Sequence, residues 1–381
     1  MTNSEENLQE RVLTVIGRGV SQPMADEEFN ECALALFAGQ FAGCAAYRAY
    51  CEQQNRTPPS VRHWKEIPAA PTRAFQNAAL ASFPVDQAAA VFHTSGTTLG
   101  KPGKHYLRTT AVYEAAIIPN FAAHLFPEPA PAATSPAPGS FPARPAAKTP
   151  LLMLVLTPAP EDAPHSSLAH MMGVVVRQWG ATGSKFYVRD GSLQIEELIR
   201  DLNEAQRLVQ PVFLLGTAFA FVHLLDHCLP RRWKFELAKG SRLMETGGFK
   251  GRSRQLPKRD LYDALARLLH LPPTHLVNEY GMTELSTQFY DESMRAGRPS
   301  DLKTVPPWAR VSVIDPHTGQ EAAAGQPGLI RIWDLANLWS MVCIQTEDLG
   351  IRHPQGFELL GRASDAESRG CSLEAEFLPV R

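Results

Sequence analysis

The chain has 381 residues, which is enough to bury one large hydrophobic core or two to three smaller ones. Hydrophobic residues make up 44% and charged residues 20%, as in an ordinary soluble globular protein, and the formal net charge of −2 argues against nucleic acid or another polyanion as partner. No apolar run approaches the roughly 20 residues that cross a membrane. The first residues are polar and acidic, unlike a secretory signal, so we expect a cytoplasmic protein without a membrane span.

Six cysteines are scattered along the chain without a paired or zinc-binding spacing, which fits a reducing compartment. Three of them, Cys32, Cys44 and Cys51, recur with large apolar residues near helical spacing within residues 25–54. We therefore predict that this region is helical and that these thiols belong to the core. The proline-held segment 67–75 is either a connector or a strap across a site.

Residues 91–104 hold the most distinctive pattern in the chain. Val91 and Phe92 predict a short strand, and the loop after it combines three glycines, four hydroxyl side chains and two lysines. Glycine lets the backbone approach an anion closely, and the hydroxyl and ammonium groups supply further donors. The loop is not the P-loop of nucleoside triphosphatases, because no Gly-Lys-Ser/Thr opens a following helix. We interpret it as a cradle for phosphate, against the alternative of a solvated turn.

Helices and strands alternate after this loop. The expected helices are 107–126, 168–179, 193–207, 218–228 and 258–269, and the expected strands are 151–156, 185–189, 212–215, 242–244 and 275–277. Pro119 should kink or end the first helix, Ser166-Ser167 should cap the second, and the Pro/Ala-rich residues 127–150 read as an extended insert. The alternation predicts a mostly parallel sheet flanked by helices, with ligands at the carboxyl ends of its strands.

Three later loops carry chemistry that complements a phosphate cradle. Residues 279–284, Glu-Tyr-Gly-Met-Thr-Glu, offer an aromatic face for a purine, a hydroxyl for phosphate and a carboxylate for Mg²⁺. Residues 346–350 offer carboxylates for ribose hydroxyls, and residues 361–365 offer an arginine. Each loop alone could be an ordinary solvated turn, so their joint order is the evidence.

In this order, the loops resemble the motifs of the adenylate-forming (ANL) superfamily. Residues 94–98 resemble its phosphate loop, residues 280–284 its YGxTE motif and Gly361-Arg362 its hinge, and Asp348 falls where the superfamily has a ribose-binding Asp. The chain more closely resembles LuxE-type acyl-protein synthetases, which are known from bacterial bioluminescence gene clusters. The segments that carry this likeness are 67–75, 92–100, 245–254, 278–284 and 361–372.

This resemblance implies a ligase that forms carbon–sulfur bonds, a long-chain-fatty-acid–protein ligase. Such an enzyme uses ATP and Mg²⁺ to make acyl-AMP from a fatty acid, moves the acyl group onto its own cysteine and delivers it to an acyl reductase. The implied catalytic residues are Cys371, Glu284, Thr283 and Lys104, with Glu284 also holding the metal. The implied nucleotide-binding residues are Thr94, Ser95, Gly96, Thr97, Thr98, Lys101, Gly247, Gly248, Tyr280, Gly281, Asp348 and Arg362.

Cys371 also fits the acyl acceptor on chemical grounds. A thioester needs a soft nucleophile, and Cys371 follows Arg369-Gly370 in a polar tail where a neighbouring cation favours the thiolate. Cys343 lies in an apolar strand and is expected to be core, and Cys228 ends a helix.

The chain departs from ordinary ANL enzymes, which carry a C-terminal domain of about a hundred residues with a catalytic lysine. Its last lysine is Lys303, so we expect Lys101, Lys104, Lys250 or an arginine to take that role. Leu99 also displaces the glycine that usually follows Thr-Thr in the phosphate loop.

We therefore expect an α/β fold with an ANL-like large domain of mostly parallel sheets flanked by helices, a small β-rich subdomain and a short C-terminal tail. The expected boundaries are 1–305 for the core, including the insert 127–150, then 306–361 for the subdomain and 362–381 for the tail with the acyl-accepting cysteine. Two other functions stay open: an acyl- or aryl-CoA ligase, and a non-catalytic nucleotide-binding subunit of a reductase complex.

Overall fold

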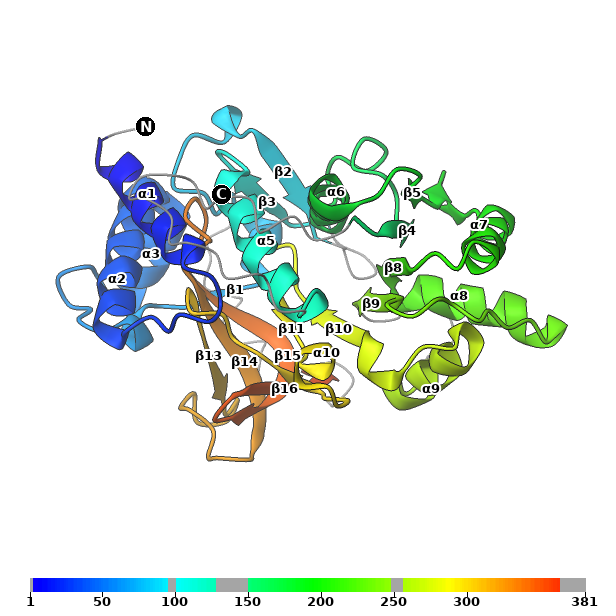
Figure 1. Ribbon diagram of the computed structural model, residues 1–381. Coiled ribbons are helices and arrows are strands. Elements are labelled where there is room, and N and C mark those ends of the chain that lie inside the picture. The colour runs from blue at the N-terminus through cyan, green and yellow to red at the C-terminus, as the bar shows by residue number, and fades with distance from the viewer. Residues whose placement is uncertain (1–2, 95–100, 128–149, 248–255, 364–381) are drawn as a thin grey trace. The chain divides into compact units, whose positions relative to one another are not determined.

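The computed structural model describes residues 3–94, 101–127, 150–247 and 256–363 (Figure 1). These residues fold as two compact units that alternate along the chain. Unit 1 takes the described residues within Met1–Asn120, Met282–Phe289 and Leu302–Arg381, and unit 2 takes those within Phe121–Gly281 and Tyr290–Asp301. The predicted domain boundaries at 305 and 361 stay a prediction.

Unit 2 is built on a sheet whose central strands run parallel. The strand order is β11-β10-β9-β8-β4-β5, and each neighbouring pair from β10 to β5 is parallel. The bounds are β4 Leu152–Leu156, β5 Lys185–Phe186, β8 Val212–Thr217, β9 Arg242–Thr246, β10 Leu276–Tyr280 and β11 Phe289–Tyr290, the last at the border of the two units. Strands β4 and β8 are apolar runs, and β4, β8 and β9 are buried almost throughout, as a sheet covered by helices requires.

Helices connect these parallel strands. They are α6 Ser167–Trp179, α7 Ile195–Arg207, α8 Ala218–Cys228 and α9 Lys258–Leu269, and the short α10 Ser293–Ala296 follows β11. Ser166 caps α6 as predicted, since its Oγ accepts from Ala169 N at 3.1 Å, and Thr217 caps α8 in the same way at 3.2 Å. A small hairpin, β6 Val188–Arg189 with β7 Ser192–Leu193, precedes α7.

Unit 1 combines helices with a mostly antiparallel sheet. Its helices are α1 Asn3–Gly17, α2 Asp26–Gly43, α3 Ala45–Gln53 and α4 Ala74–Asn77. The sheet order is β12-β16-β15-β14-β13, with β1 parallel to β15. The bounds are β1 Ala70–Pro71, β12 Leu302–Lys303, β13 Ala309–Ile314, β14 Pro327–Asp334, β15 Cys343–His353 and β16 Gly356–Arg362. The expected β-rich region is therefore present, and it lies in unit 1.

Further elements complete the described chain. The hairpin β2 Ala90–His93 with β3 Lys104–Leu107 belongs to unit 1, and α5 Ala111–Leu125 runs across the border between the units. We expected Pro119 to end or kink this helix, and α5 continues past it to Leu125. Short 3-10 helices lie at Trp64–Glu66, Val85–Gln87, Leu229–Arg231 and Pro273–His275. Among the described residues, no helix combines the length and apolar character needed to cross a membrane.

The expected core cysteines are buried. Cys32, Cys44 and Cys51 lie in or beside α2 and α3, and Cys343 begins the buried part of β15. Cys228, at the end of α8, is buried as well.

Gly356 opens β16 where β12 pairs with that strand, and this close approach gives a testable packing constraint. A Cβ at Gly356 would collide with the carbonyl oxygen of Lys303. We expect Gly356→Ala to lower the free energy of unfolding by about 1–3 kcal/mol, because backbone rather than a flexible side chain must move.

The matched control is Gly39→Ala in α2, where an added Cβ meets nothing within 4 Å. Alanine is the better helix former, so this change should leave stability unchanged or raise it by about 0.5–1 kcal/mol. Equal urea midpoints for the two variants would contradict the description of the β12–β16 contact.

Candidate functional site

The predicted phosphate loop is the turn of the β2–β3 hairpin. His93 pairs with Lys104, and beyond that pair Thr94 N donates to Gly103 O at 2.9 Å while Gly103 N donates to Thr94 Oγ1 at 2.8 Å. Gly103 is needed there, because a Cβ would lie 3.0 Å from Thr94 Cγ2 and 3.1 Å from Phe75. These bonds close the neck of the loop. Ser95, Gly96, Thr97 and Thr98 lie outside the described residues.

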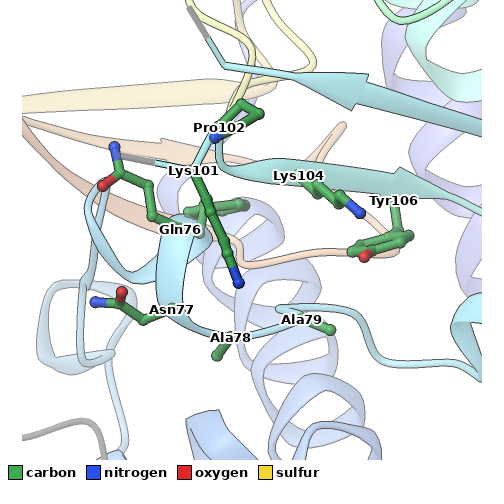
Figure 2. Close-up of a pocket in the computed structure, with 9 residues that line it drawn as sticks. Gln76, Asn77, Ala78, Ala79, Lys101, Pro102, Lys104 and Tyr106 are labelled. Atoms are coloured by element: carbon green, nitrogen blue, oxygen red, sulfur yellow. The ribbon is translucent and has the colours of Figure 1, made fainter. Parts of the chain in front are cut away.

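A hollow of about 420 Å³ opens beside this neck. Its lining comes from α4 and the residues after it, and from the hairpin: Phe75, Gln76, Asn77, Ala78, Ala79, Lys101, Pro102, Lys104 and Tyr106. Figure 2 shows Lys101 extending from the hairpin across the hollow, with Lys104 and Tyr106 along another side. No carboxylate in the described chain forms an ion pair with either lysine. The hollow therefore presents two ammonium groups, a phenol and two amides, a donor set suited to an oxygen-rich anion.

His105 joins the hairpin to the segment that carries Thr283. Its Nδ1 lies 2.6 Å from the carbonyl oxygen of Thr283, and Thr283 Oγ1 donates to His93 O at 3.3 Å. Because a carbonyl only accepts, Nδ1 carries the proton and donates. Burial lowers the pKa of His105 to about 4, so the ring is neutral at pH 7. The phosphate-loop neck and the Thr283 turn are thus fixed to each other within unit 1.

Residues 284–287 are held from the other side by a buried polar network. Asp334 accepts from Ser286 N at 2.9 Å and from Thr287 Oγ1 at 2.7 Å. Asn337 donates to the carbonyl oxygen of Glu284 at 2.8 Å and accepts from Ser286 Oγ at 2.8 Å. Burial raises the pKa of Asp334 to about 6 despite these bonds. The side chain of Glu284 starts from a backbone that is tightly positioned.

In unit 2, polar groups gather at the carboxyl ends of β9 and β10. Glu245 accepts from Asn278 Nδ2 at 2.6 Å and from the Tyr262 hydroxyl at 3.1 Å, and Thr246 Oγ1 donates to Glu279. The next residues along the chain are predicted site residues. Gly247 has φ +77°, and Gly281 leaves no room for a Cβ beside the Glu279 carboxylate. Tyr280 is buried, and Gly248 lies outside the described residues.

Asp348 and Arg362 meet across the β15–β16 pair of unit 1. They are register partners, and Arg362 Nε lies 3.7 Å from Asp348 Oδ1. The pair sits beside a register shift between Leu349 and Gly350. The neighbouring Glu347 forms an ion pair with Arg73, just before α4. Asp348 and Arg362 are therefore brought together, although they are fourteen positions apart in sequence.

The structure thus sorts the predicted site residues into two sets. Unit 1 holds Thr94, Lys101, Lys104, Thr283, Glu284, Asp348 and Arg362, and unit 2 holds Gly247, Tyr280 and Gly281. Cys371 lies outside the described residues. The roles given to all of these residues stay predictions.

Sequence reasoning missed three positioning residues, His105, Asp334 and Asn337. Asp334 and Asn337 stand in a mostly apolar run, 329–344, and buried polar side chains of that kind need hydrogen-bond partners. The sequence alone therefore marks Asp334 and Asn337 as core residues with hydrogen-bond partners. His105 alternates with Leu107 as an inward position of β3, which marks burial but not its partner.

Comparison with known proteins gives a consistent set of relatives. The family model described as "Acyl-protein synthetase, LuxE" matches residues 145–377, more than half of the chain. Two proteins named long-chain-fatty-acid--luciferin-component ligase are similar to this chain. The one from Aliivibrio fischeri is 25% identical over 203 residues, covering 50% of this chain and 52% of the relative. The one from Vibrio harveyi is 24% identical over 200 residues, covering 49% of this chain and 50% of the relative. The chain thus spans about half the length of these relatives.

Solved structures give the fold. A 2-hydroxyisobutyryl-CoA ligase in complex with 2-HIB-AMP superposes with a TM-score of 0.62 at 13% identity, covering 92% of this chain and 71% of its own. ATP-bound MatB from Rhodopseudomonas palustris gives a TM-score of 0.50 at 16% identity, covering 74% of this chain and 50% of the MatB chain. At these identities the likeness concerns fold alone, and it confirms the predicted α/β fold of adenylate-forming enzymes.

The neutral, buried state of His105 predicts a pH dependence of stability. Its pKa is about 4 in the folded chain against an ordinary value near 6.5, so the unfolded chain binds more protons between these values. Stability should fall as the pH drops through this window, by up to about 3 kcal/mol. His105→Gln keeps an N–H donor and cannot ionise, so denaturant unfolding of this variant should lose correspondingly less stability between pH 7 and pH 4.5.

The exposed His270 provides the control, because His270→Gln removes an imidazole outside the site. Its stability should follow the wild-type pH profile. Parallel profiles for wild type and His105→Gln would contradict the buried, neutral assignment of His105.

Proposed function

The chain belongs to the LuxE family of acyl-protein synthetases, and on that basis we propose that it activates a long-chain fatty acid with ATP and carries the acyl group on its own cysteine. The fatty-acid carboxylate attacks the α-phosphorus of ATP, which forms acyl-AMP and releases diphosphate. The Cys371 thiolate then attacks the acyl carbonyl carbon, forming a thioester and releasing AMP. An acyl reductase would accept the acyl group. The observation that carries the proposal is the family match over residues 145–377, which includes Cys371.

The donor set of unit 1 fits the phosphates of ATP. Lys101 and Lys104 beside the hollow belong to the same unit as the loop neck and the Thr283 hydroxyl. Hydrogen bonds close the neck and join the Thr283 hydroxyl to His93. Adenylation needs mainly positioning and neutralisation of charge, and these groups supply both. Glu284 would hold a Mg²⁺ ion, which would supply further neutralisation of the phosphate oxygens.

The remaining nucleotide contacts are assigned by chemistry. Tyr280 would cover the purine, and Gly247, where an added Cβ would meet nothing within 4 Å, would let the backbone approach the nucleotide closely. Gly281 would contact the nucleotide through its backbone, because the Glu279 carboxylate fills the space that a Cβ would take. Asp348 would accept hydrogen bonds from the ribose hydroxyls, with Arg362 as its neighbour. Lys104 would supply the catalytic cation, and Lys101 would bind the phosphates.

Burial of the other cysteines supports Cys371 as the acceptor. Cys32, Cys44, Cys51, Cys228 and Cys343 are all buried in the described chain. Burial raises the pKa of every one of these thiols, to about 12 for Cys51 and Cys343 and about 11 for Cys228. A thiol of that kind supplies little thiolate at neutral pH, so none of the five suits acyl transfer.

The proposed substrate and partner come from the relatives. Both are named long-chain-fatty-acid--luciferin-component ligases, and a luciferin component suggests an acyl reductase of a light-emitting pathway as the partner. A CoA ligase is the second candidate, because a 2-hydroxyisobutyryl-CoA ligase shares the fold over most of this chain. In that case CoA would accept the acyl group and Cys371 would have no role.

Replacing Cys371 separates these candidates. With radiolabelled long-chain fatty acid and ATP, the wild-type chain should retain label on a denaturing gel, and Cys371→Ser should retain none. The variant should still exchange diphosphate into ATP at close to the wild-type rate, because the first step does not use the thiol. Cys343→Ser, at a buried thiol, is the control and should label normally. Full labelling of the Cys371→Ser protein would contradict the cysteine assignment. So would wild-type protein that stays unlabelled and forms labelled acyl-CoA when CoA is added.

Replacing Glu284 tests the first step. Glu284→Ala keeps the carbonyl that accepts from Asn337 and removes only the carboxylate. If that carboxylate holds Mg²⁺ against the phosphates, fatty-acid-dependent diphosphate exchange should fall by at least about 100-fold. Glu292→Ala, which removes a carboxylate eight positions further along the chain and outside the motif, should exchange normally. Wild-type exchange by Glu284→Ala would refute the metal role, and no exchange by the wild-type chain would favour a non-catalytic subunit.

A further inference from the structure

Unit 2 has a second polar edge, opposite to the one that carries Gly247 and Gly281. Strands β8, β9 and β10 are parallel, so the connections that enter them lie together at their amino ends, away from the arrowheads in Figure 1. We name residues 207–211, 229–241 and 270–275 the amino edge. None of its residues has a place in the proposed reaction.

Hydrogen bonds tie the three connections of the amino edge together. Glu236 N donates to Gln206 Oε1 at 2.6 Å, at the end of α7. Val212 N donates to Ser241 Oγ at 3.0 Å, and His275 Nδ1 lies 2.8 Å from Ser241 O. The edge is therefore a single built surface rather than three separate loops.

This surface gathers the exposed apolar side chains of the described chain. The structure has six exposed large hydrophobic residues in its described part, and four belong to the amino edge: Leu208 at 53%, Val209 at 74%, Leu229 at 47% and Trp233 at 37% exposure. The other two, Val85 and Leu360, lie in unit 1. Single exposed hydrophobics are ordinary, but four on connected turns of one edge mark an interaction surface.

The backbone of Val209 supports this interpretation. Val209 has φ +51°, a left-handed conformation that is a genuine outlier for a β-branched residue. It follows α7 at a position where helices usually end in glycine, with Val209 N donating to Gln206 O at 3.1 Å and Gln210 N to Ala205 O at 2.9 Å. Glycine would relieve the strain, so the exposed isopropyl group is kept at a cost in stability.

Cations lie among the apolar residues of the connection 229–241. Arg231, Arg232, Lys234 and Lys239 are exposed within residues 229–241, against one acid, Glu236. No carboxylate in the described chain forms an ion pair with any of the four cations. The guanidinium of Arg231 lies 5.7 Å from the ring centroid of Trp233. Between residues 237 and 275 the edge also opens a hollow of about 480 Å³, with Lys239 and His270 among its lining residues.

We propose that the amino edge binds a membrane surface containing anionic phospholipid. Its exposed apolar side chains stand on separate turns that also carry cations. The headgroup region of a bilayer can rearrange around single apolar side chains of this kind. Tryptophan favours that interfacial depth, and each Lys or Arg near an anionic surface adds attraction. The hollow would take a phosphate headgroup against Lys239. This inference is independent of the proposed function.

Vesicle co-sedimentation of the full chain tests it. The chain should bind vesicles of equal parts phosphatidylglycerol and phosphatidylcholine, and should bind pure phosphatidylcholine vesicles or high-salt samples at least about tenfold more weakly. The double variants Leu208→Ser with Trp233→Ser, and Arg231→Glu with Arg232→Glu, should each lose at least about tenfold in binding. The control pair Val85→Ser with Leu360→Ser removes equally exposed apolar groups from unit 1 and should bind as wild type.

Circular dichroism and diphosphate exchange should be unchanged in these variants, which separates lost binding from lost folding or lost activity. Absence of binding to the anionic vesicles, or equal loss in the control pair, would overturn the proposal. A chain that binds soluble polyglutamate as tightly as the anionic vesicles, with a loss in the arginine variant and none in the Leu208/Trp233 variant, would also overturn the proposal. That result would assign the edge to an acidic protein.

Discussion

A buried carbonyl or amide that loses its hydrogen bond costs about 1–3 kcal/mol, and residues 283–287 are held by several such bonds. His105 donates to the Thr283 carbonyl on one side, and Asp334 and Asn337 engage residues 284–287 on the other. Gln40 adds to the hydrogen bonds around Asn337, since its side-chain amide donates to the Asn337 carbonyl oxygen at 2.9 Å. The chain passes from unit 2 into unit 1 at Met282, so this short segment depends on buried bonds for its position.

This constraint explains how one unit can bring together, from distant parts of the chain, the residues that we propose for phosphate binding. The loop neck at Thr94 and Gly103 and the turn at Thr283 are nearly two hundred residues apart, yet His93 and His105 bond directly to that turn. A neutral histidine suits this place, because a charged ring would be costly where burial is nearly complete. The loop neck and the Thr283 turn are thereby fixed to each other, and positioning of this kind before a ligand binds is the condition for electrostatic catalysis.

Much of this could be predicted from the sequence, and the reasons are physical. Apolar runs such as 151–156 and 212–215 are long and uninterrupted enough to predict buried parallel strands, and motif order predicted the adenylate-forming fold. The polar residue pairs were harder to predict. Asp348 and Arg362 meet through strand register, and His105 reaches Thr283 through a long-range packing arrangement. Such partners depend on tertiary contacts that no local pattern encodes.

The central claim is that the acyl group ends on this chain rather than on a soluble thiol. Mass spectrometry of the full chain after incubation with ATP, Mg²⁺ and a long-chain fatty acid tests it most directly, with proteolysis to locate the adduct. The account predicts one acyl group on the peptide that contains Cys371, removed by neutral hydroxylamine as a thioester is. An adduct on a peptide containing another cysteine, or an unmodified chain that forms acyl-CoA when CoA is supplied, would contradict it.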